Sequence, residues 1–194
     1  MGDTDNSIIL YTAQADAVHR AIEQDGRCFS REEFVRRKYG ESGPIFLTAY
    51  GWFVRAAAEL VPRPEGAEYP YWAFGDLHSV DQSAGTRTLK LRVPRDEAVF
   101  FDMYDWNKIL CLTYIGEDEA DEKRFKEQMA QCGIRETDAM LSNFYPEWRQ
   151  KILASWPRLL RHHERIKAGD CGGVKSVQAA LWQIKKEWVV RDPA

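Results

Sequence analysis

Two aspartates that follow an apolar segment are the first candidates for chemistry in this sequence. Asp102 and Asp105 come after the run A-V-F-F at 98–101, which has the composition of a buried β-strand. Carboxylates that connect a strand to a helix lie where ligands often bind. Asp105 also fits a helix N-cap and Asp102 a surface position, and this structural interpretation is favoured. A catalytic role for Asp102 stays open as the alternative.

The histidines give no strong signal for a metal site or for acid–base catalysis. His162 and His163 are adjacent on an expected helix, where side chains point about 100° apart and cannot share one ion. His78 lies near Asp76 and Asp81 in an expected loop, where a polar turn is favoured over a proton-transfer pair. The sequence also lacks the motifs of phosphate-binding loops, nucleophile elbows and H-E-x-x-H metalloproteases. We predict no metal site.

Aromatic residues are the main compositional anomaly, with seven tryptophans and eight tyrosines in 194 residues. Most are expected in the core, because aromatic side chains bury a large apolar area. One or two can instead line a pocket and stack on a planar ligand such as a base or a nicotinamide ring. Trp72, within Y-P-Y-W-A-F, is the candidate for such a position.

Alternating apolar residues predict a small sheet, and apolar residues at helical spacing predict helices around it. Ser30 and Glu33 have the spacing of a capping box. Strands are expected at 7–12, 69–74, 88–93 and 98–101, with a closing strand within 174–190, and helices at 14–25, 31–40, 44–60 and 123–131 and from Asp105, Thr137 and Ser155.

These elements define an α+β fold with a small, mostly antiparallel sheet flanked by about seven helices. The length of 194 residues fits a single domain over 1–194, in which the polar residues 1–7 form a disordered tail. A charged fraction of 29% and a hydrophobic fraction of 44% are ordinary for a globular protein.

Charge and cysteine content narrow the expected partners and compartment. A net charge of −3 argues against a generic binder of nucleic-acid backbones, which usually has a basic surplus. No apolar run approaches the ~20 residues that span a bilayer, and the acidic start has no signal-peptide pattern, so no membrane association is expected. The four cysteines form no C-x-x-C pair, which favours reduced thiols in the cytoplasm.

Four segments in a fixed order resemble a bacterial family catalogued as a domain of unknown function. They are L-Y-T-A-Q at 10–14, Y-P-Y-W-A-F at 69–74, V-F-F-D-M-Y-D-W at 99–106 and V-Q-A-A-L-W-Q-I-K-K-E-W-V-V at 177–190. Members typically open with L-Y-T-I-Q or L-W-T-I-Q, carry P-x-W-A-W in the middle and end with a strand like V-Q-A-T-F-W-E-I. The resemblance covers nearly the whole chain and implies no established activity.

A fainter similarity is to ADP-ribosyltransferase-like folds, some of which open with L-Y-H-x-T and a helix that ends in glycine. In those folds the opening strand holds the nicotinamide end of NAD, and a late strand carries a catalytic glutamate. This resemblance implies that Tyr11, Thr12 and Gln14 orient the ring and that Trp72 stacks on it. At the place of the glutamate this chain has the neutral Gln178, with Asp102 as a speculative substitute.

Two functional hypotheses follow. The first is a cytoplasmic ligand-binding domain for a small molecule or nucleotide, related to NAD-dependent ADP-ribosyltransferases, with NAD as the implied cofactor and Asp102 or Gln178 at the reacting centre. The second is a non-catalytic module of a phage-related or stress-response system that binds a protein partner. Strand residues aimed into one cleft favour the first hypothesis, and a flat aromatic patch favours the second. The sequence does not decide whether the protein is an enzyme.

Overall fold

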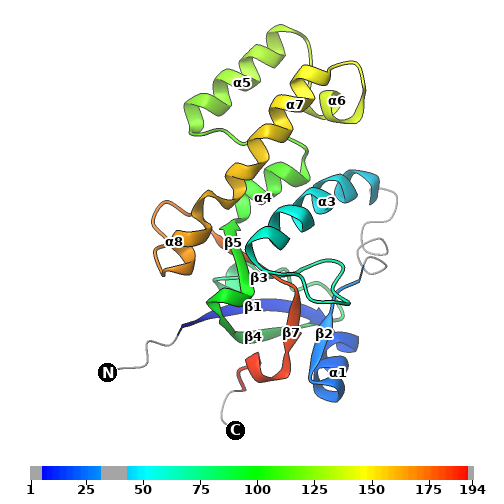
Figure 1. Ribbon diagram of the computed structural model, residues 1–194, viewed down its shortest axis with the longest axis vertical. Coiled ribbons are helices and arrows are strands. Elements are labelled where there is room, and N and C mark those ends of the chain that lie inside the picture. Colours follow the sequence, from blue (N-terminus) through cyan, green and yellow to red (C-terminus); the bar gives the residue numbers. More distant parts are fainter. Residues whose placement is uncertain (1–5, 32–42, 192–194) are drawn as a thin grey trace.

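The computed structural model describes residues 6–31 and 43–191, with 43–45 described in their backbone only. The molecule is elongated, with a β-sheet at one end and a helical arm at the other (Figure 1). The helix expected at 31–40, with its Ser30–Glu33 capping box, lies outside the described residues. No helix in the described part of the chain has the length and apolar character needed to cross a bilayer.

The main sheet has five strands in the order β4-β1-β3-β6-β5, and every pairing is antiparallel. β1 pairs with β4 along its whole length, from Ser7 opposite Pro94 to Ala15 opposite Thr86. This confirms the expected α+β class with a small antiparallel sheet. The strands are β1 Ser7–Ala15, β3 Tyr71–Phe74, β4 Thr86–Pro94, β5 Ala98–Asp102 and β6 Val177–Leu181, and a second sheet pairs β2 Arg27–Phe29 with β7 Gln183–Lys185.

Helices α3 and α4 and those of the arm pack over one face of the main sheet and extend beyond it (Figure 1). The other apolar cluster includes Ile22 of α1, which lies near β2, and Ile166 of α8. A nearly continuous helical rod runs from α7 through η4 to α8 and connects the arm to the sheet. The α-helices are α1 Asp16–Asp25, α3 Gly43–Leu60, α4 Met103–Leu110, α5 Glu119–Gln131, α6 Glu136–Leu141, α7 Pro146–Ser155 and α8 His163–Lys167, with the longer 3₁₀ segment η4 Trp156–His162.

Each face of the sheet has its own apolar cluster, as alternation along the strands requires. In β3, Trp72 packs with the larger cluster under α3, α4 and the arm, whereas Tyr71 and Ala73 belong to the second cluster. β5 divides in the same way, with Phe101 in the first cluster and Phe100 in the second. Both faces of the Y-P-Y-W-A-F strand are therefore covered, which explains why its residues are apolar on both sides.

The run 174–190 does contribute a strand to the main sheet, but that strand is not at the edge and does not cover the whole run. β6 lies inside the sheet between β3 and β5, and the chain leaves this sheet at Trp182, whose indole Nε1 donates to the Val61 carbonyl at 2.8 Å. After that anchor the chain forms β7 in the second sheet, and Val189 then bridges to Leu91 on β4. The run 174–190 is apolar along much of its length because its residues pack first in the main sheet, then in the second sheet and finally against β4.

The expected boundary between the first strand and first helix is also wrong. Gln14 lies on β1 opposite Arg87, and α1 begins only at Asp16. It ends at Asp25 and is followed by Gly26, which has the left-handed conformation that glycine favours. Likewise, Ser155 ends α7 instead of capping a new helix, and its hydroxyl donates to the Ile152 carbonyl at 2.6 Å. Full pairing with β4 extends β1 beyond what its own residue pattern indicates.

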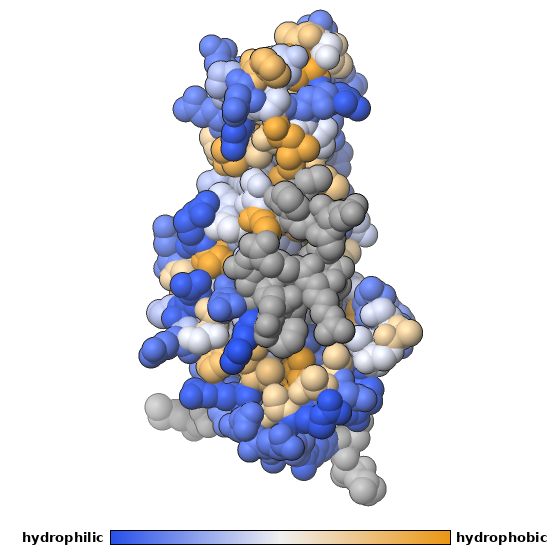
Figure 2. All heavy atoms as spheres, turned by 90° about the vertical axis from the view of Figure 1, so that its right-hand side faces the viewer, coloured by the Kyte–Doolittle hydropathy of each residue, from blue (hydrophilic) through white to orange (hydrophobic). Residues whose placement is uncertain are grey.

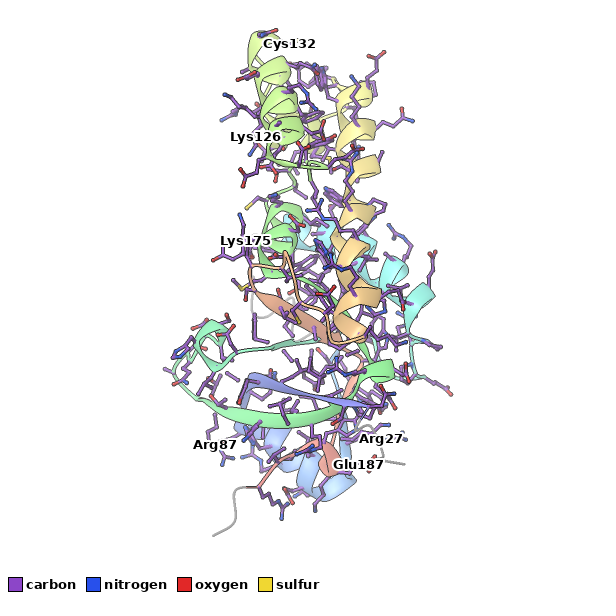
Figure 3. All side chains as sticks on the ribbon, turned by 90° about the vertical axis from the view of Figure 1, so that its left-hand side faces the viewer. Arg27, Arg87, Lys126, Cys132, Lys175 and Glu187 are labelled. Carbon is purple, nitrogen blue, oxygen red and sulfur yellow. The ribbon has the colours of Figure 1, made fainter. Side chains whose placement is uncertain are left out.

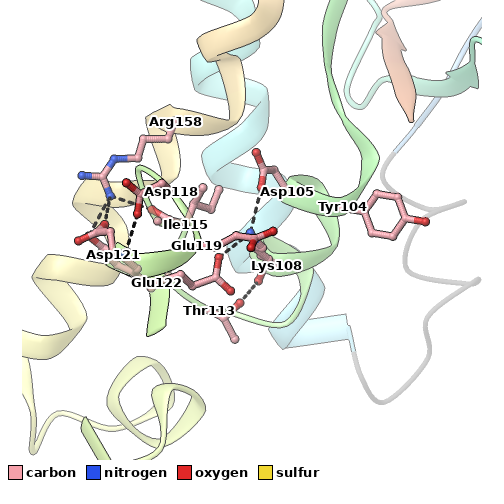
Figure 4. A network of polar contacts seen from close by, with 12 residues as sticks. Tyr104, Asp105, Lys108, Thr113, Ile115, Asp118, Glu119, Asp121, Glu122 and Arg158 are labelled. Atoms are coloured by element: carbon pink, nitrogen blue, oxygen red, sulfur yellow. Dashed lines mark hydrogen bonds and ion pairs between the residues drawn. The ribbon is translucent and has the colours of Figure 1, made fainter. Parts of the chain in front are cut away.

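A polar network joins the arm to the sheet end of the molecule (Figure 4). The buried Asp105 contacts Lys108 at 3.1 Å and Arg161 at 2.7 Å through its two carboxylate oxygens. Lys108 in turn contacts Glu122 on α5 at 2.6 Å. The network thus connects α4, α5 and the 3₁₀ segment η4, and it gives the buried Asp105 carboxylate two cationic partners.

His163, whose side chain is buried, links the helical rod to the sheet. Its Nδ1 accepts the backbone N–H of Phe100 at 3.0 Å, and its ring stacks on the Phe100 ring. Burial is the main cause that lowers the pKa of His163 below 6.5, and Lys167 adds to this, against the opposing effect of Glu164. The imidazole is therefore neutral in the folded protein near neutral pH.

We expect this histidine to weaken the fold as the pH falls below 6.5. The unfolded chain binds a proton at that pH whereas the folded protein does not, so acidification favours unfolding until the lowered pKa is reached. Urea unfolding of the wild type and of His163→Asn at about pH 7.5 and about pH 5.5 measures this. The variant keeps an acceptor and cannot titrate, so its stability should fall less. Equal losses would contradict the prediction.

Candidate functional site

A cavity with a volume of about 630 Å³ opens where β1 and β3 separate. These two strands are in register at one position only, Tyr11 opposite Phe74. Beyond it, residues 12–15 of β1 and residues 70–72 line the cavity on its two sides. Pro70 has no N–H to donate to a continued ladder, which fits the separation of the strands at this point.

A chain of hydrogen bonds holds one wall of the cavity. The Gln14 Nε2 donates to the Thr12 hydroxyl oxygen at 2.8 Å, and the Thr12 hydroxyl donates to the carbonyl oxygen of Trp72 at 2.7 Å. A side chain thus ties β1 to β3 where backbone pairing has ended. The Gln14 amide is bonded to Thr12, which is itself bonded to the backbone of β3. These two hydrogen bonds give the amide a fixed position at the cavity wall.

Trp72 belongs both to the core and to the cavity wall. Its indole Nε1 donates to the Tyr50 hydroxyl at 2.9 Å, and its ring packs against four aromatic rings in edge-on or tilted arrangements. The ring is half-buried, and the residue lines the cavity. Trp72 is thus both a core residue and a cavity residue, because the core fixes the orientation of a ring that also borders the cavity. Its ring neighbours are Tyr50, Phe53, Phe101 and Trp106.

Gln178 presents a buried amide oxygen without a partner. It lies on β6 opposite Phe74 on one side and Phe101 on the other, is 4% exposed, and lines the cavity. Among the described residues, its Oε1 has no hydrogen-bond partner. A buried acceptor left unpaired costs about 1–3 kcal/mol, so an acceptor kept in this state at a cavity wall is a candidate for ligand contact.

The structure does not place Asp102 and Tyr11 among the residues that line the cavity. Asp102 is buried and caps α4, since its Oδ1 accepts the Tyr104 N–H at 2.9 Å and its Oδ2 accepts the Lys175 N–H at 2.7 Å. The helix cap is thus Asp102, and the assignment of the cap to Asp105 is wrong. Both oxygens of Asp102 hold backbone in place, which is a structural role.

Four of the six residues named from the sequence therefore meet at one cavity, from β1, β3 and β6. Sequence reasoning missed the part of the wall that comes from β2 and α4. Cys28 lines the cavity and its sulfur accepts the Tyr71 hydroxyl at 3.1 Å, while burial, followed by this bond, raises the pKa of Tyr71. Trp106 and Asn107 line it from α4. The only available signal for Trp106 and Asn107 was their position just after the expected strand at 98–101.

The chemistry of the wall is aromatic, amide and hydroxyl, with little charge. Among the lining residues Asp81, in the loop before β4, is the one carboxylate. Within the described residues, no group of three His, Cys, Asp or Glu side chains is placed to hold a metal ion. Such a wall suits a neutral, flat ligand with hydrogen-bonding groups at its edge.

The fold and this cavity define an α+β domain with an aromatic and amide-lined pocket at a divided antiparallel sheet. Residues 9–190 match the family model described as "Domain of unknown function (DUF3841)", so the chain belongs to that family. Comparisons with curated proteins and with solved structures gave no significant match. The family resemblance is therefore confirmed, whereas the similarity to ADP-ribosyltransferase-like folds stays a prediction.

We expect Trp72→Ala to lower the free energy of unfolding by about 3 kcal/mol, because the substitution removes a large ring from a packed aromatic cluster. Trp72→Phe should cost less, since it keeps a ring and loses the hydrogen bond to Tyr50. Urea denaturation measures both. Equal stability of wild type and Trp72→Ala would show that the ring contributes no packing energy to the core.

Gln178→Met should leave the protein as stable as the wild type or raise its stability by up to ~1 kcal/mol, because an unpaired buried oxygen is replaced by an apolar group of similar length. Gln183 is a matched control: it is also buried with an unpartnered Oε1 but does not line the cavity. Thermal unfolding of both variants tests this. A large loss in Gln178→Met alone would indicate an essential structural contact of its amide.

Proposed function

We propose that this protein is a cytoplasmic ligand-binding domain whose cavity receives a flat nitrogen heterocycle, such as nicotinamide or a nucleobase. The observation that carries the proposal is the Gln178 Oε1 atom, an acceptor without a partner in a buried position at the cavity wall. A ligand N–H group, as in a carboxamide or an exocyclic amine, satisfies such an oxygen. Binding then offsets a desolvation cost that the empty site carries.

The other cavity residues support a ring of this kind. Trp72 is held by its own hydrogen bond to Tyr50 and by its ring neighbours, so it provides a surface for stacking without an ordering cost. Gln14 is fixed by Thr12 and offers an amide at the cavity wall. A volume of about 630 Å³ lies within the range of small-molecule sites and accommodates a ring with its attached sugar.

The similarity to ADP-ribosyltransferase-like folds makes NAD the first ligand to test. Transfer of ADP-ribose passes through an oxocarbenium-like centre, which a nearby carboxylate stabilises. Gln178 is neutral, and Asp102 uses both oxygens on backbone N–H groups, so neither offers a free negative charge. The proposal is therefore for recognition of the ring, with transfer to be tested separately by release of nicotinamide.

Calorimetric titration with nicotinamide, NAD and adenosine should detect at least one ligand for the wild type. Gln178→Met should weaken that ligand by on the order of tenfold, the loss expected for one buried hydrogen bond, and Gln183→Met should bind like the wild type. Absence of any ligand, or equal weakening by both variants, would contradict a binding role of Gln178. NAD binding without nicotinamide release would limit the activity to binding.

A protein-interaction module, in a phage-related or stress-response setting, is the second candidate. The end of α6 and the connection after it expose two large apolar side chains, with Leu141 59% and Phe144 86% exposed. Figure 2 shows apolar atoms at this end of the arm beside a mostly hydrophilic surface. This function would be favoured by a partner whose binding is lost on Phe144→Ser and retained in Gln178→Met.

A further inference from the structure

A second, smaller hollow of about 340 Å³ adjoins the start of α1 and carries two arginines. It is lined by Asp16 and Arg20 of α1, by Gly85, and by Thr86 and Arg87 of β4. Thr86 also lines the main cavity, so the two hollows share a wall. Figure 3 shows Arg87 at the end of the sheet where β4 lies over α1.

The first turn of α1 contributes polar backbone to the same region. Ala15 is the N-cap and makes no capping hydrogen bond with its side chain, so the first N–H groups of this ten-residue helix receive no such partner. Ala15, Ala17 and Val18 line the main cavity. The N-terminus of a helix carries a partial positive charge and favours anionic groups.

The charges of the smaller hollow leave one cation in excess. Arg87 contacts Asp16 at 2.8 Å through its Nε, and both side chains are well exposed, at 65% and 62%. Arg20 is the second cation of the hollow, and Asp16 is its only carboxylate among the lining residues. An exposed pair of this kind contributes little stability, so Arg87 can exchange its partner for an incoming anion at small cost.

An independent observation supports a ligand in the adjoining cavity, namely the buried, unpartnered Gln178 Oε1 at its wall. We infer that this ligand is a nucleotide whose phosphate occupies the smaller hollow, contacting Arg20, Arg87 and the first-turn N–H groups of α1, while its ring lies in the main cavity. This inference rests on the proposed function and adds the phosphate to it. Arginine recognises phosphate through paired N–H groups, and Thr86 lies at the junction of the two parts.

The test compares ligands that differ only in phosphate: adenosine against AMP, and nicotinamide riboside against nicotinamide mononucleotide, titrated into the full chain by calorimetry. The phosphorylated member of the pair that binds should bind on the order of tenfold tighter to the wild type. Arg20→Gln and Arg87→Gln should each remove most of this difference and leave the affinity for the unphosphorylated member unchanged. Asp16→Asn should increase the difference, because it removes a competing carboxylate.

Arg55→Gln is the charge-matched control, since Arg55 is exposed on α3 and lines neither hollow. Equal affinity of the two members of each pair would overturn the phosphate subsite and leave the ring site intact. A loss in Arg55→Gln as large as in Arg87→Gln would also overturn it, as an effect of overall charge. Inorganic phosphate that binds the wild type and not Arg87→Gln, with no nucleoside bound, would support the subsite and contradict the ring site. No binding of any probe would overturn both.

Discussion

The early separation of β1 from β3 is the constraint on which the site depends. One position in register, Tyr11 opposite Phe74, joins the two strands, whereas β1 and β4 are paired over nine residues. A fully paired sheet would bring Thr12 and Gln14 against β3 and leave no cavity at this point. The side chain of Thr12 closes the gap with a single bond to the Trp72 carbonyl. The sheet therefore stays continuous while it opens a cavity between two of its central strands.

The aromatic cluster makes this opening rigid. Phe53 of α3 contacts the rings of Trp72, Phe101 and Trp106 at centroid distances of 5.1–5.3 Å, so helix and sheet meet through rings that are fully or partly buried. Rings held in this way lose little entropy when a ligand arrives. The Asp105 network supports the same region from the other side, because it fixes α4, which supplies Trp106. The packed aromatic rings of the core, Trp72 and Trp106 among them, thus also form part of the cavity wall.

The residue pattern predicts the fold class and the individual strands well, because alternation in β4 and the apolar run of β5 are local properties. It does not predict which strands are neighbours. The run 174–190 is apolar along much of its length, yet β6 lies inside the main sheet and β7 lies in the second sheet. The chain changes sheets at Trp182, whose indole is held in the core by its hydrogen bond to the Val61 carbonyl. The helix cap is Asp102 instead of Asp105 for a related reason: Asp105 is buried against Arg161, which is distant in sequence.

The neutral side chain of Gln178 determines which ligand groups this part of the cavity can recognise. A carboxylate at this position would lie on a buried strand with no cation among the cavity residues to balance it, and burial would favour its protonated form. An amide stays neutral at every pH and offers one strong acceptor, which suits recognition of an N–H group more than stabilisation of a developing positive charge. The cationic groups lie instead at the adjoining exposed hollow, where water lowers their desolvation cost. A neutral inner part and a cationic outer part match a ligand with a flat ring at one end and an anion at the other.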